Sequence, residues 1–378
     1  MCPGSSRPSN KISPELQNRP KQTSSFLLSE APINPSNNPN GRFETPFNSQ
    51  QQSQELWLTN LVYVKDADSE LIQAIAQDDQ VESITEEQIA HLIEPIDMKK
   101  VEALADEKQW GVVKIQAPEA WQELGTLSGE GVIIATVDTG VRGTHEALKD
   151  NFVGEYGWFD PSTNTPTPTD NNGHGTHTSG TIAGGKGVGV APGAKWAACR
   201  GCASSACYQS DLLACGDFFA CPTRADGSSP DCSKAPNVVS NSWGGGRGNT
   251  WYNGVIEGWH AAKIIPLFSN GNSGPSCNTA NSPADQNVIA DPTSSQPTTL
   301  LTLPTSHFPE LPWLVLMRLE LLLCLQVRDK NLSYVKAKEF LLGQTDKNLV
   351  SSGRTCEGIP DNEFPNHVFG LIFMIQVS

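Results

Sequence analysis

The run DTG at residues 138–140 and the run HGTHTSG at residues 174–180 decide the fold of this chain. Residues 131–137, directly before the first run, read GVIIATV, which is typical of a buried parallel strand. The second run follows a turn signal and reads as the first part of a helix. Because open α/β sheets place their chemistry at the carboxyl ends of their strands, we expect Asp138 and His174 to meet there.

A third run, SNGNSGP at residues 269–275, adds an amide group in Asn272. The chain order is therefore an acid, a base and an amide, which is the order of the subtilisin-type catalytic arrangement. The run at 138–140 alone also fits an aspartic protease. That chemistry needs two carboxylates that share a proton, and the sequence contains no second copy of the motif.

The three runs together resemble those of the subtilisin-like serine proteases (subtilases, peptidase S8 family). This resemblance implies an α/β fold with a subtilisin-like, mostly parallel sheet and helices on both faces, over residues 110–290. It implies a serine endopeptidase that acts on peptides or proteins. His174 is then the general base, Asp138 orients its imidazole, and Asn272 donates to the oxyanion.

The substrate groove is expected along two strand ends. Residues 238–245 read VVSNSWGG, a buried strand that ends in a glycine-rich edge. In subtilases this edge pairs with the extended substrate backbone, so Ser242, Trp243 and Gly244 are candidate substrate-binding residues. The alternative is a core strand followed by a turn.

The second expected wall of the groove follows the apolar run IIPLF at residues 264–268. By resemblance, Ser269, Asn270 and Gly271 line the pocket for the side chain that precedes the scissile bond. Asn270 departs from the small apolar residue that the family pattern leads us to expect, so the resemblance does not predict the cleavage preference.

His177 gives a His-x-x-His spacing with His174, but no third ligand lies nearby in the sequence. We interpret His177 as structural and expect neither a catalytic metal nor a cofactor. A structural calcium ion is left open.

The nucleophilic serine is missing. The family continues with a loop and helix that carry GTSMAxPH, and no such run occurs in this sequence. Residues 310–317 instead read ELPWLVLM. Codons can be chosen for these eight residues so that the same DNA also encodes the serine motif in another frame. With a G added in front and the reading frame moved one base earlier, it reads GTSMASPH. We therefore interpret residues 291–326 as a frameshifted segment, residues 327–378 as a C-terminal remnant of the catalytic domain, and the chain as inactive.

The alternative to an inactive protease is a non-catalytic protein that binds peptides in the remaining groove. Membrane insertion is not expected, because the apolar stretch 311–323 contains Arg318 and Glu320 and is shorter than the roughly 20 residues that a span needs. No signal peptide is visible at the start of the sequence. The resemblance and the cysteines nevertheless favour a secreted protein.

Before the catalytic region, residues 1–55 are rich in Ser, Pro, Asn and Gln and are expected to be disordered. Residues 56–109 weakly resemble the inhibitory prodomain of subtilases, followed by a linker. Between Glu55 and Trp110 the sequence has fourteen acidic and four basic residues, which argues against nucleic-acid binding. The alternative is the solvated surface of an unrelated small domain.

Six of the ten cysteines lie close together in an apparent insertion of the catalytic region. They are Cys199, Cys202, Cys207, Cys215, Cys221 and Cys232. This clustering predicts disulfides and an oxidising compartment, with a connectivity that the spacing does not reveal. Zinc is the rival interpretation, because Cys199 and Cys202 have ligand spacing, but no second Cys-x-x-Cys pair follows.

Overall fold

The computed structural model describes residues 11–13, 24–30, 52–93, 108–114, 117–124, 129–273, 278–291, 329, 332–343, 355–356 and 359–360. Its strands are β1 (Ser24–Glu30), β2 (Ser53–Leu56), β3 (Leu61–Ala67), β4 (Val81–Glu86), β5 (Ile89–Leu92), β6 (Ile133–Val137), β7 (Trp158–Phe159), β8 (Lys195–Cys199), β9 (Ala206–Tyr208), β10 (Val238–Asn241), β11 (Trp243–Gly244), β12 (Ile265–Ser269), β13 (Ile289–Asp291), β14 (Thr355–Cys356) and β15 (Ile359–Pro360). Its helices are α2 (Ser69–Ala76), α3 (Trp110–Lys114), α4 (Ala117–Leu124), α5 (His174–Ala183), α6 (Gln209–Ala220), α7 (Asn253–Ala261) and α9 (Tyr334–Gly343), with a 3-10 turn, η1 (Cys232–Lys234).

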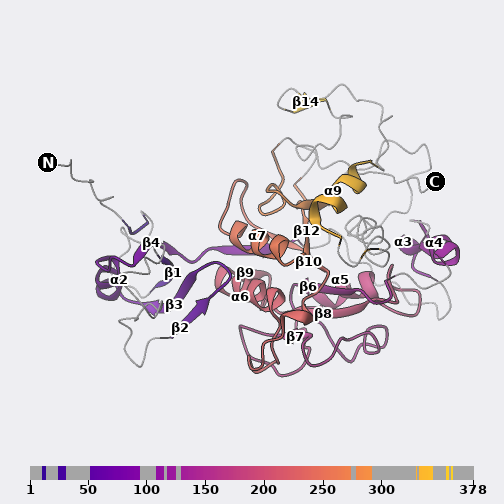
Figure 1. Cartoon of the computed structure of the whole chain (residues 1–378), viewed down its shortest axis with the longest axis horizontal. Helices are drawn as coiled ribbons and strands as arrows, with labels where there is room; N and C mark the ends of the chain where they lie inside the picture. Colours follow the sequence, from indigo (N-terminus) through magenta and orange to yellow (C-terminus); the bar gives the residue numbers. More distant parts are fainter. Residues whose placement is uncertain are drawn as a thin grey trace.

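The central sheet has six strands in the order β13-β12-β10-β6-β8-β7, and every neighbouring pair is parallel. Its middle strands are buried on both faces, which explains the continuous apolar runs of β6, β10 and β12. The predicted parallel α/β sheet is confirmed (Figure 1).

Helices cover both faces of this sheet, as expected. On one face, Ala135 and Val137 of β6 pack in one cluster with residues of α6 and α7, among them Phe219 and Trp259. On the other face, Ile134 packs in a second cluster with residues of α5, α4 and α9. This alternation along β6 follows from the side-chain period of two in a strand.

The N-terminal part forms a separate antiparallel sheet in the order β2-β3-β1-β4, with α2 beside β4. The expectation of disorder for residues 1–55 was wrong for Ser24–Glu30, because β1 lies between β3 and β4, and for residues 53–55, which pair with β3 as part of β2. Phe26 and Leu28 are fully buried there and form the core of the module with Val64 and Ile84. A short apolar run in a polar region forms a central strand here because β3 and β4 flank it. We call residues 24–30 and 52–93 the N-terminal module.

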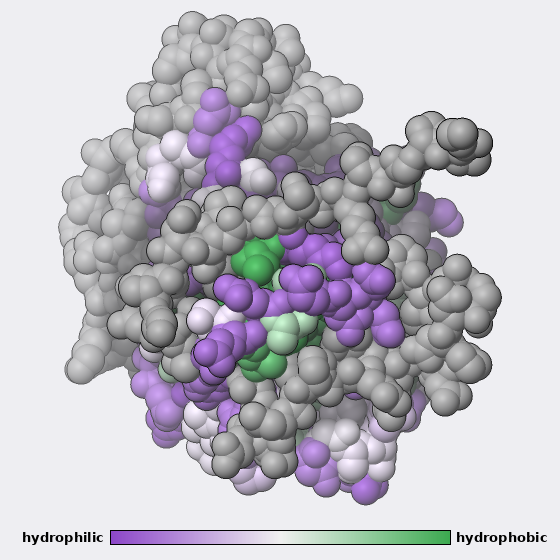
Figure 2. Space-filling view, turned by 90° about the vertical axis from the view of Figure 1, so that its left-hand side faces the viewer, coloured by the Kyte–Doolittle hydropathy of each residue, from purple (hydrophilic) through white to green (hydrophobic). Residues whose placement is uncertain are grey.

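The N-terminal module sits at one end of the molecule, beside α6 (Figure 1). Seen from that end, its described surface is largely hydrophilic around a smaller apolar area (Figure 2). Asp217 of α6 accepts hydrogen bonds from the backbone N–H groups of Trp57 and Leu58, at 2.9 and 3.0 Å. At the start of α6, Glu87 accepts from the backbone N–H and the hydroxyl of Ser210. The module and α6 are thus joined by one carboxyl group from each, Glu87 of the module and Asp217 of α6.

The contact at Asp217 predicts a pH dependence of stability. Burial raises the pKa of Asp217 to about 7, although the two backbone donors act in the opposite direction. Between its ordinary pKa of 3.8 and about 7, the folded chain keeps a proton that the unfolded chain has released. This group therefore stabilises the fold fully below pH 3.8, and its contribution is lost as the pH rises to about 7. The loss is at most about 1.4 kcal/mol per pH unit.

Urea unfolding of the parent chain and of Asp217→Asn at pH 5 and pH 7.5 measures this contribution. We expect the parent to lose more free energy of unfolding than the variant over that range. An equal loss in both proteins would contradict the assignment to Asp217.

Six cysteines form three disulfides, Cys199–Cys215, Cys202–Cys207 and Cys221–Cys232. The prediction that the clustered cysteines form disulfides is confirmed. Among the described residues, no helix is long and apolar enough to cross a bilayer.

Candidate active site

Three neighbouring strands of the central sheet end at the same level. Val137 of β6 is in register with Asn241 of β10, which is in register with Phe268 of β12. The residues that follow these three in the sequence are Asp138, Ser242 and Ser269. The sheet therefore brings three of the predicted site segments to one carboxyl edge, although they are far apart in the sequence.

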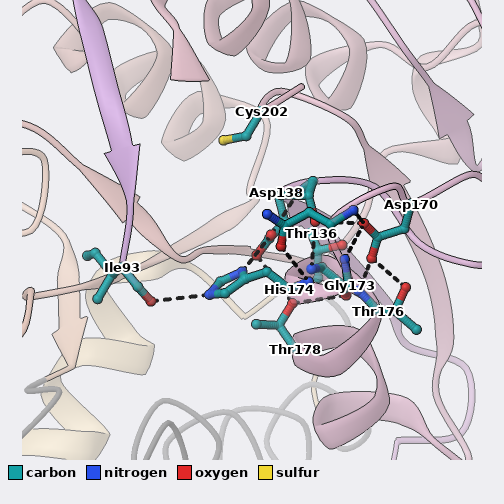
Figure 3. Close-up of polar contacts among 12 residues, drawn as sticks. Ile93, Thr136, Asp138, Asp170, Gly173, His174, Thr176, Thr178 and Cys202 are labelled. Atoms are coloured by element: carbon teal, nitrogen blue, oxygen red, sulfur yellow. Dashed lines mark hydrogen bonds and ion pairs between the residues drawn. The ribbon is translucent and has the colours of Figure 1, made fainter. Parts of the chain in front are cut away.

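Asp138 and His174 form the acid–base pair that the sequence predicts (Figure 3). The Nδ1 atom of His174 lies 2.7 Å from Oδ1 of Asp138, and both residues are buried. The same oxygen accepts from the backbone N–H of Thr139 at 2.7 Å, and the hydroxyl of Thr178 donates to Oδ2 at 3.3 Å. These donors stabilise the carboxylate, so it is suited to hold the imidazole with its Nδ1 proton facing Asp138.

The loop before α5 fixes the position of His174. Asp170 accepts from the backbone N–H groups of Gly173 and Thr176, and from the Thr176 hydroxyl. Burial alone would raise the pKa of Asp170, but these hydrogen bonds outweigh it and hold the pKa below its usual value. Gly175 has no room for a side chain, because a Cβ there would overlap the carbonyl oxygen of Gly140. The glycine lets the first turn of α5 approach Asp138 closely.

His177 lies one turn further along α5. Burial lowers its pKa, and the neighbouring His174 lowers it further. Its Nδ1 atom has no hydrogen-bond partner within the described structure. No group of three potential metal ligands occurs among the residues that the structure describes.

A segment of the chain itself lies where the sequence predicts the substrate groove. Strand β5 lies between β11 and β9 and pairs antiparallel with both. Leu92 is in register with Trp243, and the backbone N–H of Ile93 donates to the carbonyl of Ser242 at 2.9 Å. On the other side, the N–H of Leu92 donates to the carbonyl of Ser205 at 3.0 Å. Residues 89–93 are thus held as an extended peptide between two strand edges.

Ile93, the last residue of this segment that the structure describes, lies beside the imidazole of His174. The carbonyl oxygen of Ile93 lies 3.2 Å from Nε2 of His174, which is the ring nitrogen that does not face Asp138 (Figure 3). A hydrogen bond at this contact needs a proton on Nε2, whereas a nucleophilic hydroxyl would donate its own proton to that atom. The bond after Ile93 is therefore at the point where the base would act.

Two of the predicted substrate-binding residues, Trp243 and Gly244, pair with β5. Trp243 pairs with the peptide only through its backbone, because its ring is fully buried among Trp251, Tyr252 and Phe268. Gly244 is in register with His91 of the peptide. Trp243 is thus a core residue whose backbone pairs with Leu92.

The second wall follows β12. Ser269 and Asn270 are buried, and Oδ1 of Asn270 has no hydrogen-bond partner among the described residues. Gly271 has a φ of 98°, and a Cβ there would collide with the side chain of Asn281. Asn272 follows this left-handed residue and is half-buried. The carboxyl end of β12 thus turns sharply just before Asn272, the residue for which the resemblance implies the role of oxyanion donor.

Sequence reasoning missed the opposite edge of the groove, residues 205–208, and the peptide that lies against it. A signal for this edge was available, since Cys202 precedes it and Cys207 lies within it, but the pairing of these two cysteines could not be derived from their spacing. It also missed Asp170 and Thr178 as supports of the acid–base pair.

Comparison with known proteins finds a family whose profile matches the part of the chain that carries this site. Residues 129–302 match the profile of the subtilase family, Peptidase_S8, and the matched region ends before residues 310–317. The chain is 36% identical over 230 residues to bacillopeptidase F of Bacillus subtilis, covering 55% of this chain and 16% of that protein. It is 34% identical over 197 residues to thermitase of Thermoactinomyces vulgaris, covering 50% of this chain and 63% of that protein. The chain therefore spans only part of both relatives.

The fold agrees with a solved structure. The epidermin leader peptide processing serine protease of Staphylococcus aureus superimposes with a TM-score of 0.50 and 17% identity, covering 72% of this chain and 70% of that one. The chain is thus similar to subtilisin-like serine proteases over this region, and the predicted fold class is confirmed.

Proposed function

We propose that this chain is a subtilisin-type serine endopeptidase in which the groove, the base and its orienting acid are present but the nucleophile is absent. The observation that carries the proposal is the placement of the Ile93 carbonyl at Nε2 of His174, at the end of a peptide paired on both sides. Peptide recognition by strand addition gives affinity through the backbone and leaves the side chains to set preference.

In a complete site, the chemistry would be acyl transfer. A serine hydroxyl would attack the carbonyl carbon of the peptide and give its proton to Nε2 of His174. Asp138, at 2.7 Å from Nδ1, would stabilise the imidazolium that forms. Asn272 would donate to the oxyanion, and His174 would then return the proton to the leaving amine.

The N-terminal module is the chain's own prodomain in this proposal. Its last strand, β5, fills the groove, while Asp217 and Glu87 hold the module against α6. The peptide bond between Ile93 and Glu94 would be the processing junction, because it follows the carbonyl that faces the base. A solvated domain without a role in the groove would not need these contacts.

The absence of GTSMAxPH from the sequence supports an inactive chain. The competing function is a non-catalytic protein that binds peptides in the same groove. It is supported by the intact pairing edges, which do not need a serine. The three disulfides support a secreted protein, because such bonds persist in oxidising compartments. Neither function requires a metal or another cofactor at the acid–base pair.

Processing of the prodomain tests the proposal. We define the frame-repaired chain as the protein obtained when the coding DNA for residues 291–326 is read in the frame that restores the serine motif. We expect the frame-repaired chain to cut itself between Ile93 and Glu94, and the present chain to remain whole. N-terminal sequencing and intact mass measure the outcome. Spontaneous cleavage of the present chain at that bond, or cleavage of the repaired chain only elsewhere, would contradict the proposal.

A further inference from the structure

The loop of residues 199–208 links the acid of the site to one edge of the groove. At its start, the backbone N–H of Asp138 donates to the carbonyl of Cys199 at 3.2 Å, and the N–H of Cys202 donates to the carbonyl of Asp138 at 3.1 Å. Figure 3 shows Cys202 on one side of Asp138, with Thr178 of α5 on the other. The loop therefore holds both backbone groups of Asp138.

The far end of the same loop is strand β9. Ala206 and Cys207 of β9 are in register with His91 and Ala90 of the bound peptide, and Ser205 accepts the N–H of Leu92. Strand β9 has only three residues, and its neighbour in the sheet is the peptide strand β5. A strand this short is not stable by itself, so something else must hold it in place.

Two buried disulfides provide this support. Cys202 and Cys207 are fully buried and bonded, which closes the loop five residues apart in sequence. Cys199 is bonded to Cys215 of α6 and fixes the start of the loop. Between them, a Cβ on Gly201 would crowd Val137 and Leu212, so the backbone there is packed directly on the core.

We propose that the Cys202–Cys207 disulfide is a positioning element for peptide binding. It holds β9 as the second edge of the groove, and it thereby fixes the register of the residue two places before the scissile bond. This inference rests on the proposed function, because it takes residues 89–93 as the groove peptide. It assigns to the disulfide a role at one edge only, since the opposite edge, at Ser242, belongs to the central sheet.

Two neighbouring backbone amides report separately on the two edges of the groove. The N–H of Leu92 is bonded to Ser205 on the disulfide side, and the N–H of Ile93 is bonded to Ser242 on the sheet side. Loss of support at β9 should expose the first amide and leave the second protected. General loosening of the fold would affect both.

The test is amide hydrogen exchange, resolved by NMR, in the full chain and in two disulfide variants. The first variant carries Cys202→Ala and Cys207→Ala. The matched control carries Cys221→Ala and Cys232→Ala, which removes the disulfide at the other end of α6. In the first variant we expect exchange at Leu92 to be about tenfold faster or more, since a disulfide constrains local opening, and exchange at Ile93 to change by less than about threefold.

Unchanged exchange at Leu92 in the first variant would overturn the inference, as would an equal acceleration in the control. If both amides exchange freely in the parent chain, the occupied groove itself is wrong, and the proposed function loses its main support. A Cys202→Val, Cys207→Val variant keeps apolar volume in the loop and gives the same readout if the alanine variant does not fold.

Discussion

The frame-repaired chain should hydrolyse peptides about 10⁶-fold faster in kcat than the present chain. Loss of the nucleophile from a subtilisin-type triad costs about this factor, because the base then has no hydroxyl to activate. The coding DNA for Glu310–Leu321, read in the neighbouring frame, should spell GTSMAxPH. Sequencing the locus and its transcripts checks this part of the prediction, and a locus without the motif in either frame would contradict it.

A fluorophosphonate probe, which reacts with an activated serine, tests the prediction that the repaired chain has an active nucleophile. We expect stoichiometric labelling of the repaired chain and none of the present chain. The matched control is the repaired chain with its motif serine changed to alanine. Weak turnover by the present chain is compatible with the prediction, because oxyanion stabilisation and binding alone give about 10³–10⁴-fold over water. Strong labelling of the present chain that His174→Ala abolishes would show that another serine has taken the role.

The sequence predicted the acid–base pair and the central sheet because both depend on local patterns. A β-branched run that ends in Asp138 predicts a strand end, and a turn before His174 predicts a helix start. Parallel packing then brings the two together without further information. The loop contacts of Asp170 that fix His174 at 2.7 Å from Asp138 were not part of that prediction.

The occupied groove could not be predicted because it depends on pairing between distant segments. Strand β5 has only four residues, of which two are exposed, and its partners β11 and β9 lie more than a hundred residues further along the chain. Its register is fixed by the bonds of Ile93 to Ser242 and of Leu92 to Ser205, which join residues that are more than a hundred positions apart. Strand β1 was missed for a similar reason, since three apolar residues become a central strand only when β3 and β4 flank them.

The second large effect is expected at Asp138 in the frame-repaired chain. Asp138→Asn should lower kcat about 10⁴-fold, because an amide in place of the carboxylate no longer holds the imidazole in the tautomer that accepts a proton at Nε2. KM should change little, since Asp138 contacts His174 and the backbone of Thr139 but not the bound segment 89–93.

Thr178→Val is the matched control for this prediction. It removes a hydroxyl that donates to Oδ2 of Asp138 at 3.3 Å and keeps the shape of the side chain. One neutral donor is worth about 1 kcal/mol, so kcat should fall by less than about tenfold. Steady-state kinetics on a peptide that ends in Ala-His-Leu-Ile before the scissile bond measures both variants. A large rise in KM with unchanged kcat in Asp138→Asn would mean that Asp138 shapes the groove rather than the base.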